Sequence, residues 1–153
     1  MPTQPAPANV RTVAEQGTQR SNDDLIALAA GVLRPHVAAG RLFGDVGAAL
    51  VSQGDHIYTG VSVDTASWGL CAERSAIAAM ITAGEYRIAR IVAVWRDSRS
   101  GALSVLSPCG VCREFMRAVD DGNLSTEIIL GRQGSVLLQD LLPHHHWPEP
   151  LDT

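Results

Sequence analysis

The stretch Ser107-Pro108-Cys109-Gly110-Val111-Cys112, taken together with Cys71-Ala72-Glu73, decides how this chain has to fold. The two segments hold all three cysteines of the chain. Cys109 and Cys112 are three positions apart, which places both on one face in the first turn of a helix. Three thiolates fit a tetrahedral zinc ion and leave one coordination position open, as in catalytic rather than structural zinc sites. We therefore expect Cys71 to be brought beside this pair.

Glu73 is the acid/base that this arrangement would need. Water at an open zinc position loses a proton near neutral pH, and a nearby carboxylate can transfer that proton. Side chains two positions apart diverge on a regular helix, so we expect Cys71 to lie at or before the first helical residue. Glu114 is a weaker alternative, because its face of the next helix can simply be solvated.

Cys-Ala-Glu followed by Pro-Cys-x-x-Cys resembles the cytidine deaminase family, in which a non-ligand glutamate accompanies the zinc ligands. Phe43, the small residues at 46–50, 59–61 and Leu141-Leu142-Pro143 support the resemblance, which covers about residues 43–147. It implies zinc-dependent hydrolysis of a cytosine nucleoside, cytidine or 2′-deoxycytidine, to the uracil nucleoside and ammonia. It further implies a role in pyrimidine salvage and a homotetramer.

The resemblance also implies a role for individual residues. Cys71, Cys109 and Cys112 would bind zinc, and Glu73 would carry the proton. Arg74 would offset the negative charge of the thiolates. The substrate would be contacted by Ser62, Asp64, Ala72, Ser107 and Trp147, the last of which would reach the active site of a neighbouring subunit.

Two departures from the family concern the sugar end of the substrate. Ser62-Val63-Asp64 stands where the family has Asn-x-Glu, whose side chains hold the ribose hydroxyls. The segment between Ser62 and Cys71 is also shorter than usual, which resembles the blasticidin S deaminases. Ser62 and Asp64 either hold the sugar or are ordinary polar residues at a strand end.

Two alternatives to a cytidine deaminase follow. The first is a deaminase of a modified cytosine nucleoside, such as the antibiotic blasticidin S. The second is a non-catalytic binding module stabilised by zinc. Structural sites with three cysteines normally add a fourth protein ligand, often histidine. No histidine lies close to these cysteines in sequence, which disfavours the binding module.

Composition narrows the class of protein further. The chain has 153 residues, enough for one domain, which we expect at 21–153 after a mobile tail at 1–20. The net charge of −4, without a dense basic run, disfavours a nucleic-acid partner. No segment approaches the roughly 18 apolar residues of a membrane span. An odd cysteine count without a secretory signal favours metal binding and a cytoplasmic location.

The hydrophobic pattern predicts an α/β fold with three layers, α/β/α, around a mixed sheet of about five strands. Ser21 should cap a helix that ends before Pro35, and further helices should begin near Cys71 and Cys109. The small residues at 46–51 suggest that another element packs closely on that strand. Residues 41–47 are expected to be turn. Strands are predicted at 46–51, 56–63, 88–95, 103–106, 126–130 and 136–138.

Overall fold

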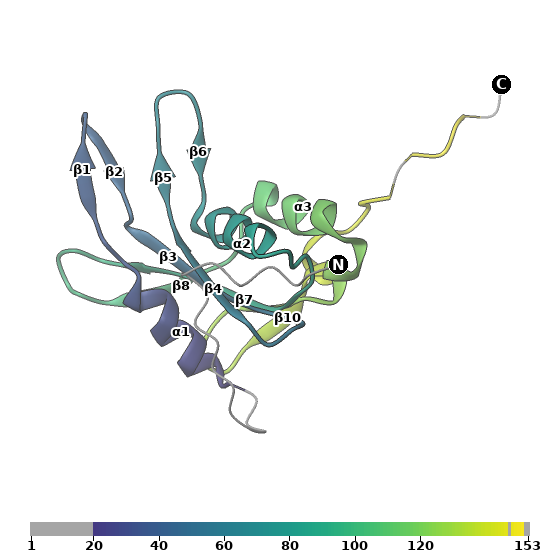
Figure 1. Cartoon of the computed structure of the whole chain (residues 1–153), viewed down its shortest axis with the longest axis horizontal. Helices are drawn as coiled ribbons and strands as arrows, with labels where there is room; N and C mark the ends of the chain where they lie inside the picture. The colour runs from purple at the N-terminus through teal and green to yellow at the C-terminus, as the bar shows by residue number, and fades with distance from the viewer. Residues whose placement is uncertain (1–19, 147, 152–153) are drawn as a thin grey trace, which may run out of the picture.

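The computed structural model describes residues 20–146 and 148–151, so the predictions for the N-terminal tail before Arg20 and for Trp147 lie outside the described residues. Figure 1 shows the arrangement of the elements. In chain order they are α1 (Asn22–Gly31), β1 (His36–Ala38), β2 (Arg41–Phe43), β3 (Val46–Ser52), β4 (Ile57–Val61), β5 (Val63–Asp64), β6 (Gly69–Leu70), α2 (Ala72–Thr82), β7 (Ile88–Arg96), β8 (Leu103–Leu106), α3 (Gly110–Val119), the 3₁₀ helix η1 (Asp121–Ser125), β9 (Glu127–Ile129), β10 (Ser135–Leu137) and α4 (Leu138–Leu141).

The central sheet is mixed and is built around β7. Its strand order is β10-β9-β7-β3-β4, and β8 also pairs with β7. One edge of β7 is paired along its length with antiparallel β3. The other edge is shared, because parallel β9 pairs at Arg90 and Ile91 while antiparallel β8 pairs from Ala93 to Arg96. This sharing gives six strands where about five were expected, and it confirms the mixed α/β sheet.

Helices cover both faces of the sheet, as Figure 1 shows for α1 on one side and α2 with α3 on the other. The alternation along β3 explains the two faces, since neighbouring side chains of a strand point in opposite directions. Ala48 and Leu50 enter the core formed with α2 and α3. Ala49 and Val51 enter the core formed with α1. The predicted three-layer architecture is confirmed.

Two glycines let the helices approach the sheet more closely than a side chain would allow. A Cβ atom on Gly47 of β3 would lie 2.3 Å from the backbone oxygen of Ala29 in α1. A Cβ atom on Gly60 of β4 would lie 2.4 Å from the backbone nitrogen of Ala76 in α2. The close packing expected from the small residues is therefore present on both faces.

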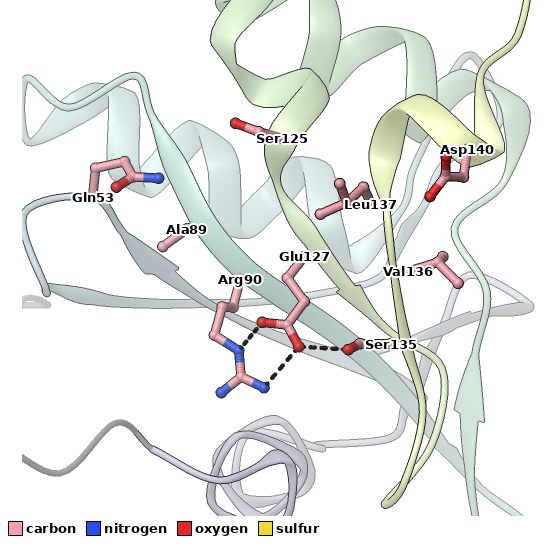
Figure 2. A pocket seen from close by; sticks show the side chains of 9 residues that line it. All are labelled: Gln53, Ala89, Arg90, Ser125, Glu127, Ser135, Val136, Leu137 and Asp140. Carbon is pink, nitrogen blue, oxygen red and sulfur yellow. Dashed lines mark hydrogen bonds and ion pairs between the residues drawn. The ribbon is translucent and has the colours of Figure 1, made fainter.

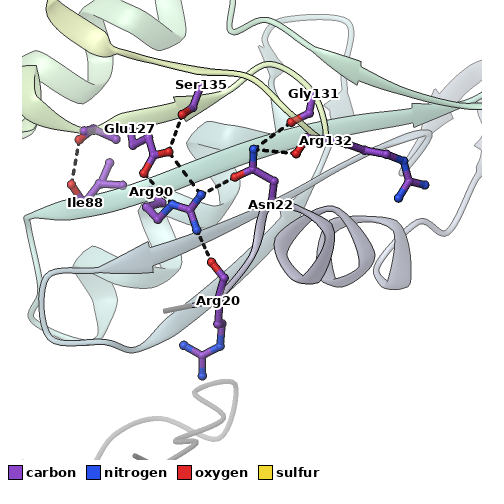
Figure 3. A network of polar contacts seen from close by, with 9 residues as sticks. Arg20, Asn22, Ile88, Arg90, Glu127, Gly131, Arg132 and Ser135 are labelled. Carbon is purple, nitrogen blue, oxygen red and sulfur yellow. Dashed lines mark hydrogen bonds and ion pairs between the residues drawn. The ribbon is translucent and has the colours of Figure 1, made fainter. Parts of the chain in front are cut away.

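Arg90 of β7 anchors the start of α1 to the sheet (Figure 3). Its Nε donates to Glu127 Oε2 at 2.8 Å, and its Nη atoms donate to Asn22 Oδ1 and to the backbone oxygen of Arg20. Glu127 also accepts a hydrogen bond from Ser135 on β10. The nearly buried guanidinium thus joins β7 to α1 and β9, and Glu127 extends the network to β10. Its removal would leave several acceptors without a donor.

Two short hairpins, β1–β2 and β5–β6, were not predicted from the sequence. They project from the same end of the molecule (Figure 1), where β2 contacts β5. Ala39 and Gly40, with φ of 50° and 73°, form the tight turn between β1 and β2. All residues of β1 are exposed, and Val37 keeps 67% of its surface. A strand exposed on both faces lacks the alternation that reveals most strands, so residues 41–47 were wrongly expected to be only turn.

Candidate active site

The N-termini of α2 and α3 bring the three cysteines together. Cys71 is the N-cap of α2, with the extended φ of −64° and ψ of 152°, which confirms its expected position outside the helix. Cys109 is likewise the N-cap of α3, and Cys112 lies in the first turn of that helix. Figure 1 shows both helices on the same face of the sheet. Each thiol therefore lies at the start of a helix, and none lies within a loop.

The geometry of the thiols fits a zinc ion. All three Sγ atoms lie within 4.8 Å of one another, and those of Cys71 and Cys109 are 3.8 Å apart. Zinc–sulfur bonds of 2.3 Å in a tetrahedron place the sulfurs about 3.8 Å apart. Within residues 20–146 and 148–151, this is the only cluster of at least three His, Cys, Asp or Glu side chains arranged to hold a metal. Three soft ligands without a fourth leave room for a water molecule.

Glu73 is buried beside this cluster, with only 6% of its surface exposed. Burial raises the pKa of its carboxyl group, and the opposing effects of its own backbone amide, Cys112 and Arg74 do not cancel that rise. The group therefore keeps its proton to a higher pH than an ordinary glutamate. A carboxyl group with a raised pKa is suited to both accepting and returning a proton near neutral pH.

The two thiols of α3 are in different environments. Burial raises the pKa of Cys109, but hydrogen bonds from the Cys112 and Val111 backbone amides and from the Cys112 and Cys71 thiols lower it below the ordinary thiol value. These amides are the free donors of a helix N-terminus, which favour negative charge. Burial also raises the pKa of Cys112, and the negative charges of Glu73 and Cys71 raise it further. A bound cation would favour the thiolate at both positions.

Arg74 lies where the sequence placed it, next to the thiols. Its Nη2 donates to the backbone oxygen of Gly69 at 2.8 Å and is 4.0 Å from Cys71 Sγ. Burial lowers the pKa of Arg74, but the Cys71 and Cys112 sulfurs raise it above the ordinary value. Its Nε is buried without a hydrogen-bond partner among the described residues. A positive charge at this position would offset the excess negative charge of three thiolates around one Zn²⁺.

Trp68 was not expected near the site. The guanidinium carbon of Arg74 lies 5.9 Å from the centre of the Trp68 ring, within cation–π range. The Trp68 side chain nevertheless keeps most of its surface exposed. The sequence shows an aromatic residue in the short segment before Cys71. An aromatic residue there does not by itself predict that an arginine will contact its ring.

Ser62 and Asp64, the residues expected to hold the sugar, already form polar contacts within the protein. Ser62 Oγ donates to Asp45 Oδ1 at 2.8 Å and accepts from the Val46 backbone nitrogen at 3.2 Å. Both hydrogen-bonding directions of this hydroxyl are thus in use. Asp64 is largely exposed on β5 and pairs with Arg41 at 3.5 Å. A substrate would have to replace or share these contacts.

The remaining residues expected to contact substrate differ in accessibility. Ser107 is exposed just before Pro108, whereas Ala72 is fully buried at the start of α2. Trp147 lies outside the described residues. The structure thus groups Cys71, Cys109, Cys112, Glu73 and Arg74 closely, and the substrate contacts remain predictions.

A cavity of about 540 Å³ lies elsewhere, beside β9 and β10 (Figure 2). Arg90 and Glu127, which form an ion pair, are among its lining residues, and no cysteine lines it. The Arg90 donors that would attract an anion are already bound to Glu127, Asn22 and Arg20. The side chains that line it are those of Gln53, Ala89, Arg90, Ser125, Glu127, Ser135, Val136, Leu137 and Asp140.

Within the described part of the chain, no helix has the length and apolar character needed to cross a membrane.

Comparison with known proteins finds similarity to cytidine and deoxycytidylate deaminases. The family model for the cytidine and deoxycytidylate deaminase zinc-binding region matches residues 23–127. A cytidine deaminase of Halalkalibacterium halodurans is 32% identical over 104 residues, which cover 64% of this chain and 74% of that protein. A probable cytidine deaminase of Dictyostelium discoideum is 38% identical over 72 residues. That match spans about half of either protein, 46% of each.

Solved structures agree with the sequence relatives. The crystal structure of cytidine deaminase from Mycobacterium leprae has a TM-score of 0.64 and 28% sequence identity, and the match covers 80% of this chain and 97% of that one. The cytidine deaminase structure from Burkholderia pseudomallei also gives a TM-score of 0.64, over 82% of this chain and 98% of the other. The similarity therefore extends over nearly the whole length of both solved proteins.

Proposed function

Because this chain belongs to the cytidine and deoxycytidylate deaminase family, we propose that it hydrolyses the amino group of a cytosine nucleoside. Cytidine or 2′-deoxycytidine and water would give uridine or 2′-deoxyuridine and ammonia. The observation that carries the proposal is the convergence of three thiols beside a buried glutamate with a raised pKa. A structural zinc site would have no use for such a glutamate.

The cofactor is Zn²⁺, in keeping with the zinc-binding region of the family and with the thiol cluster. In the proposal, Cys71, Cys109 and Cys112 are its ligands. When bound, zinc supplies a Lewis acid that lowers the pKa of a water molecule toward neutrality. Arg74 moderates the negative charge of the thiolates through its position near Cys71 Sγ.

Glu73 carries the proton in this mechanism. Its carboxylate accepts a proton from the attacking water and transfers it to N3 of the cytosine ring, while the water oxygen bonds to C4. Glu73 then takes the remaining proton from the hydroxyl on C4 and gives it to the amino group, which leaves as ammonia as the C4–N bond breaks and the C4=O bond forms. Both protons of the water are thereby accounted for. Burial favours the protonated carboxyl that acts as the donor in each transfer.

The wider setting of the enzyme forms part of the same proposal. Ser62, Asp64, Ala72 and Ser107 contact the nucleoside, and Trp147 reaches the active site of a neighbouring subunit. The assembly is a homotetramer that acts in cytoplasmic pyrimidine salvage. The exposed hairpins β1–β2 and β5–β6, which carry Val37, Leu42 and Trp68 with much of their apolar surface uncovered, are compatible with contacts between subunits.

A modified cytosine nucleoside is the second candidate substrate. The observation in its favour is the short segment from Ser62 to Cys71, together with Ser62 and Asp64 in place of the asparagine and glutamate of the family. The named relatives are cytidine deaminases, which favours the unmodified nucleoside. A non-catalytic zinc module has no support beyond the thiols themselves.

A substrate panel would test the proposal. Zinc-loaded protein would be incubated with cytidine, 2′-deoxycytidine, cytosine and blasticidin S, and the loss of cytosine absorbance would be recorded. We expect turnover of the first two and about one zinc per chain, with zinc lost in Cys109→Ala. Turnover of blasticidin S alone would select the second candidate. Zinc-loaded protein that turns over none of these compounds would contradict the proposed activity.

A further inference from the structure

Arg113 directly follows Cys112 in the first turns of α3 and bonds to three separate groups. Its Nε donates to the backbone oxygen of Pro108 at 2.8 Å, and its Nη2 donates to Ser107 Oγ at 3.2 Å. Its Nη1 donates to the backbone oxygen of Leu141, the last residue of α4, at 3.1 Å. A guanidinium is planar and its donors point in fixed directions, so three such bonds hold it in one orientation.

The segment that Arg113 holds is the one that presents Cys109. Cys112 is fully buried and is fixed by the packing of α3, whereas Cys109 is exposed at the N-cap. Pro108 has no N–H group, so its carbonyl is the only backbone group through which it can be hydrogen-bonded. Arg113 donates a hydrogen bond to that carbonyl through its Nε. Its Nη1 donates to the Leu141 carbonyl at the end of α4, which has no hydrogen-bond donor within its own helix.

We propose that Arg113 is a positioning residue for the metal site. It holds the turn at 107–109 against α4. It thereby fixes the positions of the Cys109 sulfur and the Ser107 hydroxyl. The inference rests on the proposed function, since it concerns the zinc site of that enzyme. Groups that orient metal ligands without touching the metal typically change metal affinity or activity roughly 10- to 100-fold.

The substitution Arg113→Lys tests this role at constant charge. Lysine carries a single ammonium group on a flexible stem, which cannot reproduce the three diverging bonds of Arg113. Arg117→Lys is the matched control, because Arg117 lies on the same helix and pairs with the surface residues Glu114 and Asp121. The zinc-loaded proteins would be mixed with a chromophoric chelator and the rate of zinc release recorded. The visible spectrum of the Co²⁺-substituted proteins would report the geometry of the thiolate site.

We expect Arg113→Lys to release zinc roughly 10- to 100-fold faster than the wild type and to show altered Co²⁺–thiolate bands. Arg117→Lys should match the wild type in both measurements. Folded Arg113→Lys with wild-type release and wild-type bands would overturn the proposal. Altered bands would support it, because loss of a purely structural contact does not move the cobalt spectrum. Equal acceleration in both variants would also overturn it.

Ser107→Ala provides a second route if Arg113→Lys does not fold. It removes one of the three acceptors and leaves α3 intact, so zinc release should rise by roughly two- to tenfold. An unchanged rate would count against the role of Arg113. Zinc release requires no turnover. A wild-type protein that holds zinc but deaminates no nucleoside would therefore contradict the proposed function without affecting this inference.

Discussion

Glu73 is buried in α2, and this burial raises the pKa of its carboxyl group. We expect Glu73→Gln to fold and to retain zinc but to lose roughly 10²- to 10⁴-fold in kcat, because an amide cannot carry a proton. Glu114→Gln is the control, since Glu114 is exposed and bonds to Arg117. Steady-state kinetics on cytidine would provide the comparison. A Glu73→Gln enzyme with near wild-type kcat would remove Glu73 from the chemistry.

Asp64 is the residue through which the sugar should be recognised. Losing one hydrogen bond to a charged group would raise KM for a nucleoside by roughly 10- to 150-fold in Asp64→Ala, with zinc content unchanged. Arg41→Ala separates this effect from the hairpin contact, because it removes the Arg41–Asp64 pair and keeps the carboxylate. If both variants raise KM equally, Asp64 acts through the hairpin and not on the substrate.

The placement of Cys71 relative to Glu73, and of Cys109 relative to Cys112, could be predicted from residue spacing because the members of each pair are close in sequence. The divergence of Cys71 and Glu73 on a helix required an N-cap cysteine, and Cys71 is that residue. The partners of Ser62 and Asp64 could not be predicted. Arg41 lies on β2 and Asp45 between β2 and β3, and only the folded chain brings them close to Asp64 and Ser62. Arg113 was missed for the same reason, since its partner Leu141 belongs to a distant helix.

Helix α2, which would carry the catalytic glutamate, is placed by its approach to β4 at Gly60. A Cβ atom in Gly60→Ala would lie 2.4 Å from the Ala76 nitrogen, which is backbone and cannot move aside. Overpacking of this kind costs about 1–3 kcal/mol, or roughly 2–12 °C in Tm for a chain of this length. Because α2 carries Cys71 and Glu73, we also expect kcat to fall.

Gly134→Ala is the matched control for this prediction. No atom lies within 4 Å of the position that its Cβ would take. Thermal unfolding followed by circular dichroism should therefore leave this variant close to the wild type. A Gly60→Ala protein with unchanged Tm and kcat would show that the contact between β4 and α2 can relax.

Elements with at least one buried face were predicted well, and elements exposed to solvent on most sides were not. The strands β3 and β7 and the three long helices carry apolar patterns that packing enforces. Residues 36–43 and 63–70 form hairpins whose side chains face mostly solvent, so no periodic pattern is required of them. The short helix α4 was also missed, because four residues do not complete a readable period.

Across the whole molecule, the Arg90–Glu127 pair should give stability a specific dependence on pH. Burial raises the pKa of Glu127, but hydrogen bonds from Ser135 and Arg90 lower it below the ordinary value. A lowered folded-state pKa means that the pair contributes stability above the unfolded pKa of about 4.3, and that this contribution is lost as the pH falls through the folded pKa.

Glu127→Gln would reveal that contribution. At pH 7 we expect it to reduce the free energy of unfolding by about 1–3 kcal/mol, because Arg90 is left largely buried without its ionic partner. Urea denaturation at a series of pH values should show the gap to the wild type shrinking below about pH 4.3. A gap that stays constant down to pH 3 would indicate that lost packing, rather than lost charge, causes the effect.

The position of β7 between the two ligand-bearing helices has a kinetic consequence. Cys71 precedes this strand and Cys109 follows it through β8, so we expect the sulfurs to meet only after β7 has paired with both β3 and β8. Interactions formed after the folding transition state slow unfolding and leave the refolding rate nearly unchanged. In stopped-flow denaturant jumps, we expect zinc removal to accelerate unfolding alone. The newly synthesised chain would then pass through a folded, metal-free form, and the supply of zinc would control how long each molecule survives rather than how fast it folds.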